Sequence, residues 1–297
     1  MKKKILLSGA NGQLGKTFRA LSGNYNQWEW YFLSKKEFNL ESEDSVRTAL
    51  NNIKPDIIIN CGAYTAVDQA ESEYQKAMLI NAESLGWIAD YAEKNKSQVI
   101  HFSTDYVYHN QCNRPLLETD VCTPQSVYGK SKLEGEQLLL SIHPISLILR
   151  TSWVYSPYCK NFFLTMQKLA EKRDGLKVVN DQIGSPTYTF DLAESCLNII
   201  DSHFNKGKEF PSGIYNYSNE GCCSWYDFAH AILELSGKKV QLTPVSSNEF
   251  PAKAPRPEFS LMSKKKIRSL LNQPIPHWRD SLKNCINRQS SKLIIEE

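Results

Sequence analysis

Short runs of apolar residues recur along the first half of the chain, and segments with helical periodicity separate them. The runs are continuous rather than alternating, and they lie at residues 4–8, 28–33, 57–62, 98–102 and 146–150. Strands have this composition when both faces of a parallel sheet are covered by helices. The pattern therefore predicts an α/β fold with a Rossmann-type doubly wound parallel sheet.

A glycine-rich turn, GANGQLG at residues 9–15, follows the first predicted strand and precedes a helical pattern. Strand, glycine turn and helix in this order are the context that a phosphate-binding loop requires. Glycines let backbone N–H groups approach a pyrophosphate at the positive end of the helix. The spacing is GxxGxxG rather than GxGxxG, and its position after the first strand favours a dinucleotide ligand.

The ends of the next two predicted strands refine this hypothesis. An acidic residue at the end of the second strand would hold the ribose 2′-hydroxyl of NADH. This strand ends instead in Ser34 and Lys35, which suit a 2′-phosphate, so NADPH is favoured, although NADH stays open. The third strand is followed by Gly62 and Ala63, and then by Tyr64 and Thr65. The small residues that begin this segment leave room for a cofactor to lie across the strand end.

The regular alternation of strands and helices loosens after about residue 155, where short strands are predicted at 177–179 and 213–217. We expect an NAD(P)-binding Rossmann domain at residues 1–155, which also holds the catalytic residues. Residues 156–297 are expected to form a smaller mixed α/β substrate-binding region, with some segments returning to the Rossmann sheet.

Composition and charge exclude several classes of protein. A net charge of +3 on 297 residues is too small to indicate a nucleic-acid partner, and the basic cluster at 264–268 is predicted to be a solvated helix face. No stretch approaches the roughly 18 apolar residues of a membrane span, and the first apolar run ends too early for an export signal. The scattered cysteines indicate reduced thiols. We therefore expect a cytoplasmic protein without nucleic-acid or membrane partners.

The candidate chemistry lies between residues 103 and 132. Thr104 ends a predicted strand, and Tyr128 and Lys132 are four residues apart on one face of a predicted helix. A tyrosine, with an ordinary pKa of roughly 10, becomes an effective acid–base group when a nearby cation stabilises its anion. Tyr31 and Lys35 have the same spacing but lie at a strand end, so only the first pair predicts a site for ketone reduction.

With these residues assembled, the chain resembles the extended short-chain dehydrogenases/reductases and, more narrowly, the bacterial dTDP-4-dehydrorhamnose reductases. The motifs that carry the resemblance are GANGQLG (9–15), NCGAYTAVDQAE (60–71), STDYVY (103–108), YGKSKLEGE (128–136), LRTSWVY (149–155), DQIGSPTY (181–188) and SWYDFA (224–229). They span nearly the whole chain, and STDYV and DQxGSPTY are more specific than the glycine loop.

The resemblance implies NAD(P)H-dependent reduction of the C4 keto group of dTDP-4-dehydro-L-rhamnose to dTDP-L-rhamnose. This is the last step before the sugar enters surface polysaccharide such as the O-antigen of lipopolysaccharide. It implies that Tyr128 is the proton donor, Lys132 its electrostatic and ribose partner, and Thr104 the hydroxyl that orients the carbonyl. The implied cofactor contacts are Gly9, Asn11, Gly12, Gln13, Leu14, Asn39, Leu40, Gly62, Ala63, Tyr64 and Thr65. Asp105 and Trp153 are expected to face the sugar nucleotide, together with Thr104 and Tyr128.

Two positions depart from the family pattern, which commonly has aspartate in place of Asn39 and alanine in place of Gly62. Asn39 is still able to hydrogen-bond an adenine amino group, so we expect altered affinity rather than lost binding. The resemblance also leaves open a homodimer and a Mg²⁺ ion at a dimer contact, for which Glu296 and Glu297 are candidate ligands.

Two alternatives remain. The chain could reduce another nucleotide-linked 4-keto-6-deoxy sugar, since the configuration of one hydroxyl need not leave a mark in the sequence. It could also be a non-catalytic relative, like the regulatory subunit of methionine adenosyltransferase, which binds a partner enzyme. The complete set of Thr104, Tyr128 and Lys132 favours the enzyme.

Overall fold

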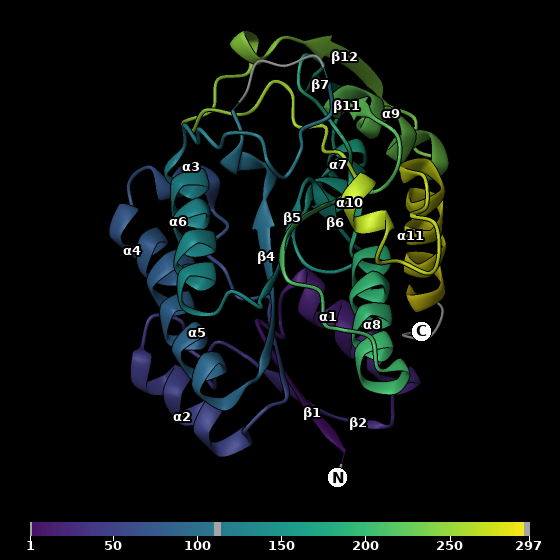
Figure 1. Cartoon of the computed structure of the whole chain (residues 1–297). Coiled ribbons are helices and arrows are strands. Elements are labelled where there is room, and N and C mark those ends of the chain that lie inside the picture. Colours follow the sequence, from purple (N-terminus) through teal and green to yellow (C-terminus); the bar gives the residue numbers. More distant parts are fainter. Residues whose placement is uncertain (1, 110–113, 294–297) are drawn as a thin grey trace.

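The protein is built around a six-stranded parallel sheet, shown in Figure 1 by a computed structural model that describes residues 2–109 and 114–293. Its strands are β1 (Lys3–Ser8), β2 (Trp28–Leu33), β3 (Ile57–Asn60), β4 (Gln98–Thr104), β5 (Leu147–Thr151) and β10 (Gly213–Tyr217). Their order is β10-β5-β4-β3-β1-β2, so the chain moves outward from β1 in both directions. This confirms the doubly wound α/β prediction and puts the switch point between β1 and β3, where ligands bind in such sheets.

Helices cover both faces of the sheet. On one face lie α2 (Glu43–Ile53), α3 (Val67–Ala70), α4 (Tyr74–Met78), the π-helical segment η2 (Leu79–Glu83), α5 (Ser84–Asn95) and α6 (Val127–Ile142). The other face carries α1 (Gln13–Leu21) and α8 (Thr189–Lys206), which pack side by side (Figure 1). Thr17 on α1 and Thr189 on α8 share a buried hydrogen bond of 2.7 Å between their hydroxyls.

The apolar strands divide their side chains between these two helical layers. Leu6 of β1 and Ile58 of β3 pack in one core with α2, α5 and α6, whereas Ile5 and Ile57 pack in a second core with α1 and α8. Successive residues of a strand point to opposite faces, so each strand must be apolar at almost every position. This is why the runs in the sequence are continuous.

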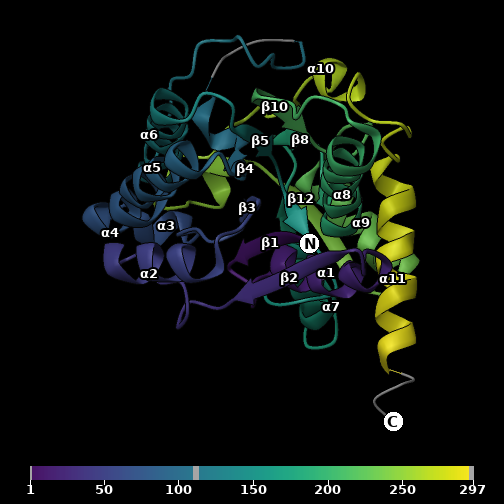
Figure 2. The same cartoon turned by 60° about the horizontal axis from the view of Figure 1, so that its bottom comes forward.

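The rest of the C-terminal part packs around α7 (Phe162–Ala170), α9 (Trp225–Leu235), α10 (Lys265–Arg268) and α11 (Trp278–Leu293), which runs along the outside of this half (Figure 2). Three small two-stranded sheets join it: β11 (Cys223–Ser224) with β8 (Ile183–Gly184), β12 (Gln241–Val245) with β7 (Gly175–Val179), and β6 (Val154–Tyr155) with β9 (Thr187–Tyr188). The 3-10 turns are η1 (Ser22–Asn24), η3 (Asp105–Val107) and η4 (Ser247–Glu249).

The two halves of the chain share structure. Strand β10 pairs with β5 in the main sheet, although it comes from beyond residue 155. One apolar core also includes strands β1 and β3 together with side chains of α8, α9 and α11. The division at residue 155 therefore stays a prediction about substrate binding rather than a boundary between separate cores. No helix in the described part of the chain is long and apolar enough to cross a membrane.

Candidate active site

A cleft of about 920 Å³ opens at the carboxyl ends of β1, β3, β4 and β5. It collects most of the residues that the sequence predicted for cofactor, substrate and catalysis, although these are spread over the chain. The predicted residues that line it are Gly9, Asn11, Gly12, Gln13, Leu14, Lys35, Asn39, Leu40, Gly62, Ala63, Tyr64, Thr65, Thr104, Asp105, Tyr128, Lys132 and Trp153. The structure thus brings one continuous set of side chains to the switch point of the sheet.

The backbone of the glycine turn is packed too closely against the protein for side chains at Gly9 and Gly15. Gly9 has φ +69°, and a Cβ atom there would lie 2.7 Å from the Gly62 nitrogen. A Cβ on Gly15 would lie 2.4 Å from the Gly9 carbonyl oxygen. Gly12 precedes the first residue of α1 and provides no side-chain cap, so the positive helix end faces the cleft without a competing side chain.

Gln13 fastens this turn to the C-terminal part of the protein. Its Oε1 atom accepts hydrogen bonds from Ser156 Oγ and Asn161 Nδ2, each at 2.9 Å. Asn161 also caps α7 by accepting from the Leu164 N–H at 3.0 Å. The first turn of α1 and the start of α7 are therefore hydrogen-bonded to each other, and both line the cleft.

The far end of the cleft has mixed charge. Lys35 forms an ion pair with Glu41, and both line the cleft together with Lys76 from α4. Neither Glu41 nor Lys76 was predicted, although Glu41 directly follows the predicted Asn39 and Leu40. The predicted Ser34 is not among the residues that line the cleft. Its backbone N–H donates to Glu37 Oε2 at 2.8 Å in the turn after β2.

The two departures from the family pattern have local structural partners. Asn39 Oδ1 accepts from the Glu41 N–H at 3.1 Å, so this side chain shapes the turn as well as the cleft. A Cβ on Gly62 would lie 2.7 Å from Leu40 Cδ1. Glycine at position 62 therefore makes room for the leucine that lines the same end.

The predicted catalytic hydroxyls meet where β4 ends and α6 begins. Thr104 is the last residue of β4, and its Oγ1 donates to Asp105 Oδ1 at 3.1 Å. Tyr128 is in the first turn of α6, which Ser126 caps by accepting from the Gly129 N–H at 3.1 Å. Burial raises the pKa of Tyr128 above its ordinary value, and a hydrogen bond with Thr104 opposes this shift. Tyr128 therefore keeps its proton at neutral pH.

Lys132 lies one turn further along α6 and is buried. Its Nζ donates to the Phe102 carbonyl oxygen at 2.7 Å and lies 3.0 Å from His101 Nε2. Burial lowers the pKa of Lys132 to about 7, and the carboxylate of Glu136 opposes this shift. Glu136 is itself held by Arg150 through a buried ion pair of 2.6 Å. The charge on Lys132 is therefore sensitive to pH near neutrality.

Asp105 provides an unused acceptor beside these groups. It is 2 % exposed, and its Oδ2 atom has no hydrogen-bond partner among the residues that the structure describes. Burial raises the pKa of this carboxyl to about 6, against hydrogen bonds from Ser260 and Thr104 that lower it. A buried acceptor that lines a cleft is suited to a ligand hydroxyl.

Three stacked or adjacent aromatic rings, here called the aromatic wall, also line the cleft. The ring of Trp153 stacks on that of Trp225 with centroids 3.8 Å apart, and Phe162 lies 4.6 Å from Trp225. All three line the cleft. Trp225 and Phe162 were not predicted as site residues, although SWYDFA, which contains Trp225, was among the family motifs. The wall offers flat apolar faces to a sugar or a base.

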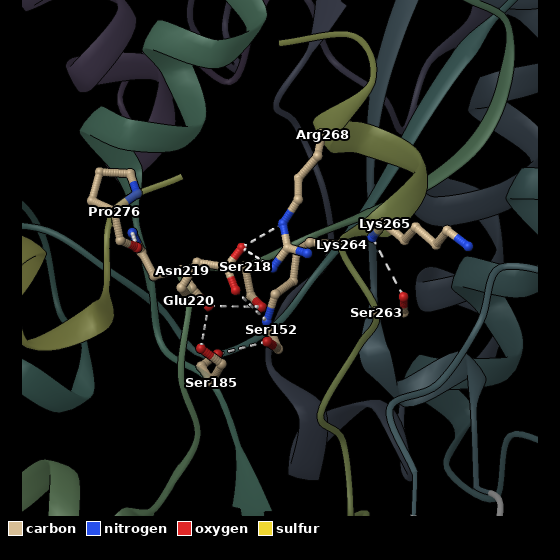
Figure 3. A network of polar contacts seen from close by, with 10 residues as sticks. All are labelled: Ser152, Ser185, Ser218, Asn219, Glu220, Ser263, Lys264, Lys265, Arg268 and Pro276. Atoms are coloured by element: carbon tan, nitrogen blue, oxygen red, sulfur yellow. Dashed lines mark hydrogen bonds and ion pairs between the residues drawn. The ribbon is translucent and has the colours of Figure 1, made fainter. Parts of the chain in front are cut away.

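Trp153 is held in an unusual backbone conformation, with φ +49°. The preceding residue, Ser152, donates to the Ser185 carbonyl at 2.7 Å, and Ser185 in turn donates to the Asn219 carbonyl at 2.6 Å (Figure 3). This network ties the turn after β5 to segments that follow β8 and β10. A left-handed tryptophan costs conformational energy, which the surrounding hydrogen bonds offset.

The same region contains the basic cluster at 264–268, which is exposed except at Lys264 and Ile267. Lys264 is 6 % exposed and lies 3.9 Å from Glu220 Oε2, and Arg268 donates to Glu220 Oε1 at 2.5 Å through Nη2 (Figure 3). Lys266 donates to the Ile214 carbonyl at 2.7 Å. The prediction of a solvated helix face is therefore confirmed for Lys265, Lys266 and Arg268, which are exposed. Lys264 is the exception, and the contacts of the cluster also hold α10 against β10 and the residues after it.

Tyr31 and Lys35, which have the same spacing as Tyr128 and Lys132, do not form a comparable site. Tyr31 donates to Glu29, while the Lys35 side chain pairs with Glu41. Tyr31 and Lys35 therefore bond to different acidic side chains, and Tyr31 does not line the cleft.

Within residues 2–109 and 114–293, no group of three or more histidine, cysteine, aspartate or glutamate side chains could hold a metal ion. The candidate ligands Glu296 and Glu297 lie outside these residues. A Mg²⁺ ion therefore stays an open prediction.

The chain matches the model of the RmlD substrate binding domain over residues 2–291. Among curated proteins it is 42% identical to the spore coat polysaccharide biosynthesis protein SpsK of Bacillus subtilis over 289 residues, which are 97% of this chain and 98% of that protein. It is 39% identical to the dTDP-4-dehydrorhamnose reductase of Aggregatibacter actinomycetemcomitans over 287 residues, which are 95% of this chain and 97% of the relative.

Solved structures of dTDP-4-dehydrorhamnose reductases are also similar to this chain. The crystal structure of a dTDP-4-dehydrorhamnose reductase from Clostridium acetobutylicum matches with a TM-score of 0.90 and 38% identity, covering 97% of this chain and 99% of that one. The enzyme from Bacillus anthracis, solved in complex with NADP, matches with a TM-score of 0.91 and 36% identity, covering 97% of this chain and 100% of that one.

Proposed function

The chain belongs to the RmlD substrate binding domain family, which includes the dTDP-4-dehydrorhamnose reductases, and from this we propose that it reduces dTDP-4-dehydro-L-rhamnose to dTDP-L-rhamnose with NADPH. The proposal rests on one observation: Thr104, Tyr128 and Lys132 line the same cleft as the glycine turn. The product would supply the synthesis of a surface polysaccharide, in keeping with the name of the Bacillus subtilis relative.

The cofactor would lie between the glycine turn and the end of β2. Backbone N–H groups at the start of α1 would bind its pyrophosphate, and Ala63, Tyr64 and Thr65 would cover its middle. Lys35 would pair with a 2′-phosphate, whereas Glu41 beside it is a potential acceptor for a 2′-hydroxyl, so NADPH is favoured and NADH stays open. When bound, the nicotinamide supplies the hydride.

The protein supplies the proton and the charge that stabilises its loss. Tyr128 holds a proton at neutral pH because burial raises its pKa, so its hydroxyl is able to protonate the reduced carbonyl oxygen. The ammonium of Lys132, one helical turn away, would stabilise the tyrosinate and bind ribose hydroxyls. With substrate bound, Thr104 would turn its single hydroxyl proton from Asp105 Oδ1 to the same oxygen and orient it.

The sugar nucleotide would occupy the part of the cleft between Asp105 and the aromatic wall. Asp105 Oδ2 has a free acceptor position for a sugar hydroxyl. Trp153 would contact the sugar, and the flat faces of Trp225 and Phe162 would pack against apolar parts of the ligand. The free thiols of the described cysteines are typical of a reducing compartment and support a cytoplasmic location. A homodimer stays a prediction.

The decisive experiment follows the loss of NADPH absorbance when purified protein meets the 4-keto sugar nucleotide. Replacing Tyr128 by phenylalanine removes the proton donor and should lower kcat by about 10²- to 10⁴-fold. Tyr31→Phe is the matched control, because Tyr31 lies outside the cleft and bonds to Glu29. This control should keep the activity of the unchanged protein.

Near-normal turnover by Tyr128→Phe would show that the proposed proton donor is wrong. Cofactor binding without reduction, together with co-purification of a larger enzyme, would instead indicate a non-catalytic relative. A panel of nucleotide-linked 4-keto-6-deoxy sugars should identify the dTDP-linked rhamnose precursor as the substrate with the highest kcat/KM.

A further inference from the structure

A string of buried polar side chains crosses the middle of the sheet and ends at Lys132. The Gly62 N–H donates to Ser8 Oγ at 3.2 Å, and Ser8 Oγ donates to Asn60 Oδ1 at 2.5 Å. Asn60 Nδ2 lies 3.1 Å from His101 Nδ1, and His101 Nε2 lies 3.0 Å from Lys132 Nζ. The two ends of the string, Gly62 and Lys132, both line the cleft.

Strand register produces this arrangement. Ser8 of β1 lies opposite Asn60 of β3, and Asn60 lies opposite His101 of β4, so three neighbouring strands each contribute one polar side chain to a single row. All three side chains are 1 % exposed. Polar groups buried this deeply cost about 1–3 kcal/mol each when they lack partners. The row is therefore tolerated in the sheet only as a connected set.

The donor and acceptor roles in the string are linked. When Asn60 Nδ2 donates to His101 Nδ1, the ring proton sits on Nε2 and donates to a neutral Lys132 amine. When Lys132 is an ammonium, it donates to Nε2 and the ring proton moves to Nδ1. The Asn60 amide then turns over, so that its oxygen accepts the ring proton and its Nδ2 donates to Ser8 Oγ. His101 itself stays neutral, because burial and the adjacent lysine lower its pKa well below the ordinary value.

We propose that His101 is a positioning residue for Lys132, one that remains hydrogen-bonded to its amino nitrogen whether that nitrogen is charged or neutral. The ammonium has three donors, of which one goes to the Phe102 carbonyl and one to His101. The third is left for the cleft. Two fixed partners would aim it at the ribose and at Tyr128, so the inference rests on the proposed reductase function.

The other charged groups near α6 do not replace this contact. Glu136, on α6 itself, acts on Lys132 through space and is bound by Arg150. The elements packed against α6 are β4, η3, α3, α4, η2 and α5. Besides His101, they carry the titratable side chains Asp105, Tyr106, Asp68, Tyr74, Lys76, Glu83, Asp90, Tyr91, Glu93 and Lys94, and α6 itself carries Tyr128, Lys130, Glu134 and Glu136.

Two amide substitutions separate the two sides of the ring. Glutamine at position 101 puts its amide near the place of Nε2 and keeps a partner for Lys132. Asparagine puts its amide near the place of Nδ1 and keeps only the partner for Asn60. Both amides are polar and neutral, so a general effect on sheet stability should appear in either variant, and thermal unfolding of each provides that comparison.

We expect His101→Gln to stay within about 3-fold of the unchanged protein in kcat, because a partner for Lys132 is kept. His101→Asn should lose about 10- to 100-fold in kcat, as orienting partners of functional groups commonly do. Its alkaline limb in kcat/KM should move about one pH unit lower, because a charge-assisted hydrogen bond is lost and the ammonium is disfavoured. Equal activity and equal pH profiles in both variants, or loss only in His101→Gln, would overturn the proposal.

A second measurement does not depend on turnover. The titration of Lys132 can be followed by nuclear magnetic resonance of isotope-labelled lysine ε-carbons, with the signal assigned by its absence in Lys132→Met. The midpoint should fall in His101→Asn and stay in place in His101→Gln. An unmoved midpoint in His101→Asn would overturn the positioning role even if the sugar proved to be a different substrate, and a shifted midpoint would support it in that case too.

Discussion

Two ionisable residues of the cleft have pKa values close to neutrality for the same physical reason. Burial penalises the charged form of each, which raises the pKa of Asp105 to about 6 and lowers that of Lys132 to about 7. Each residue would nevertheless act in its charged form. The Asp105 carboxylate would accept a hydrogen bond from a sugar hydroxyl, and the Lys132 ammonium would stabilise tyrosinate. At the scale of single residues, the proposed activity therefore depends on a narrow range of pH.

We expect kcat/KM of the free protein to follow a bell-shaped pH profile. It should rise as Asp105 ionises through about pH 6 and fall as Lys132 loses its proton through about pH 7. Asp105→Asn keeps the shape of the side chain but cannot ionise. Steady-state rates across this range should therefore lose the acid limb in the variant and keep the alkaline limb. An acid limb that survives the substitution would show that another group titrates there.

The same variant tests the burial of the charge. Because the folded pKa of Asp105 is raised, its folded form binds protons more tightly than the unfolded chain, and stability falls as pH rises through the range between the two values. Thermal unfolding should show Asp105→Asn gaining stability over the unchanged protein at neutral pH. The gain should disappear below about pH 4, where both states are protonated.

At the scale of elements, the contact between α6 and η2 fixes where Tyr128 and Lys132 stand. A Cβ on Gly135 of α6 would lie 2.0 Å from the Asn81 carbonyl oxygen, so the two helical backbones touch. Asn81 Nδ2 also donates to Ser131 Oγ at 3.0 Å, and its Oδ1 accepts from the Tyr64 N–H at 2.8 Å. The helix that carries the proposed acid–base pair is thus held against the segment that covers the cofactor.

Gly135→Ala should force α6 away from η2. Overpacking of this kind costs about 1–3 kcal/mol in the free energy of unfolding, and the displaced helix should also lower kcat. Gly23→Ala is the control, since a Cβ at Gly23 meets nothing within 4 Å and should change stability by no more than about 0.5 kcal/mol. Chemical denaturation of both variants would check this, and equal stability would show that the contact relaxes freely.

The secondary-structure elements of the first half could be predicted from the sequence, whereas contacts between them could not. The five strands of the first half and the start of α6 followed from local apolar runs and spacing, as did the glycine turn, Thr104, Tyr128 and Lys132. Most of the other predicted cleft residues followed from the family resemblance. His101 was read as part of an apolar run, because its role comes from neighbours on β3 and α6 that only register and packing bring close. Lys76 and Phe162 were missed for the same reason, since no local pattern marks them.

At the scale of the whole molecule, Asn219 joins segments that are far apart in the chain. Its Nδ2 donates to Asp191 Oδ2 at 2.6 Å and to Ser281 Oγ at 2.8 Å, and its Oδ1 accepts from the Tyr188 N–H at 2.8 Å. These partners belong to α8, α11 and β9. One amide after β10 thus connects three elements around the second core.

Asn219→Ala should leave the Asp191 carboxylate with fewer donors and the Tyr188 N–H without its acceptor. Buried groups left unpaired cost about 1–3 kcal/mol each, so the variant should lose about that much stability or more. Asn205→Ala provides the comparison, because Asn205 bonds to Asp201 on an exposed part of α8. Denaturant midpoints should separate the two variants clearly. A similar small loss in both would mean that the network contributes little.

The place of β10 at the edge of the sheet has a consequence for synthesis on the ribosome. Strand β5 ends at Thr151, and its neighbour β10 ends at Tyr217, 66 residues later (217 − 151). At about 5–20 residues per second, the growing chain spends roughly 3 to 13 seconds with the β5 edge unpaired. An open edge of this kind pairs readily with other chains, so the nascent protein is prone to association during this interval.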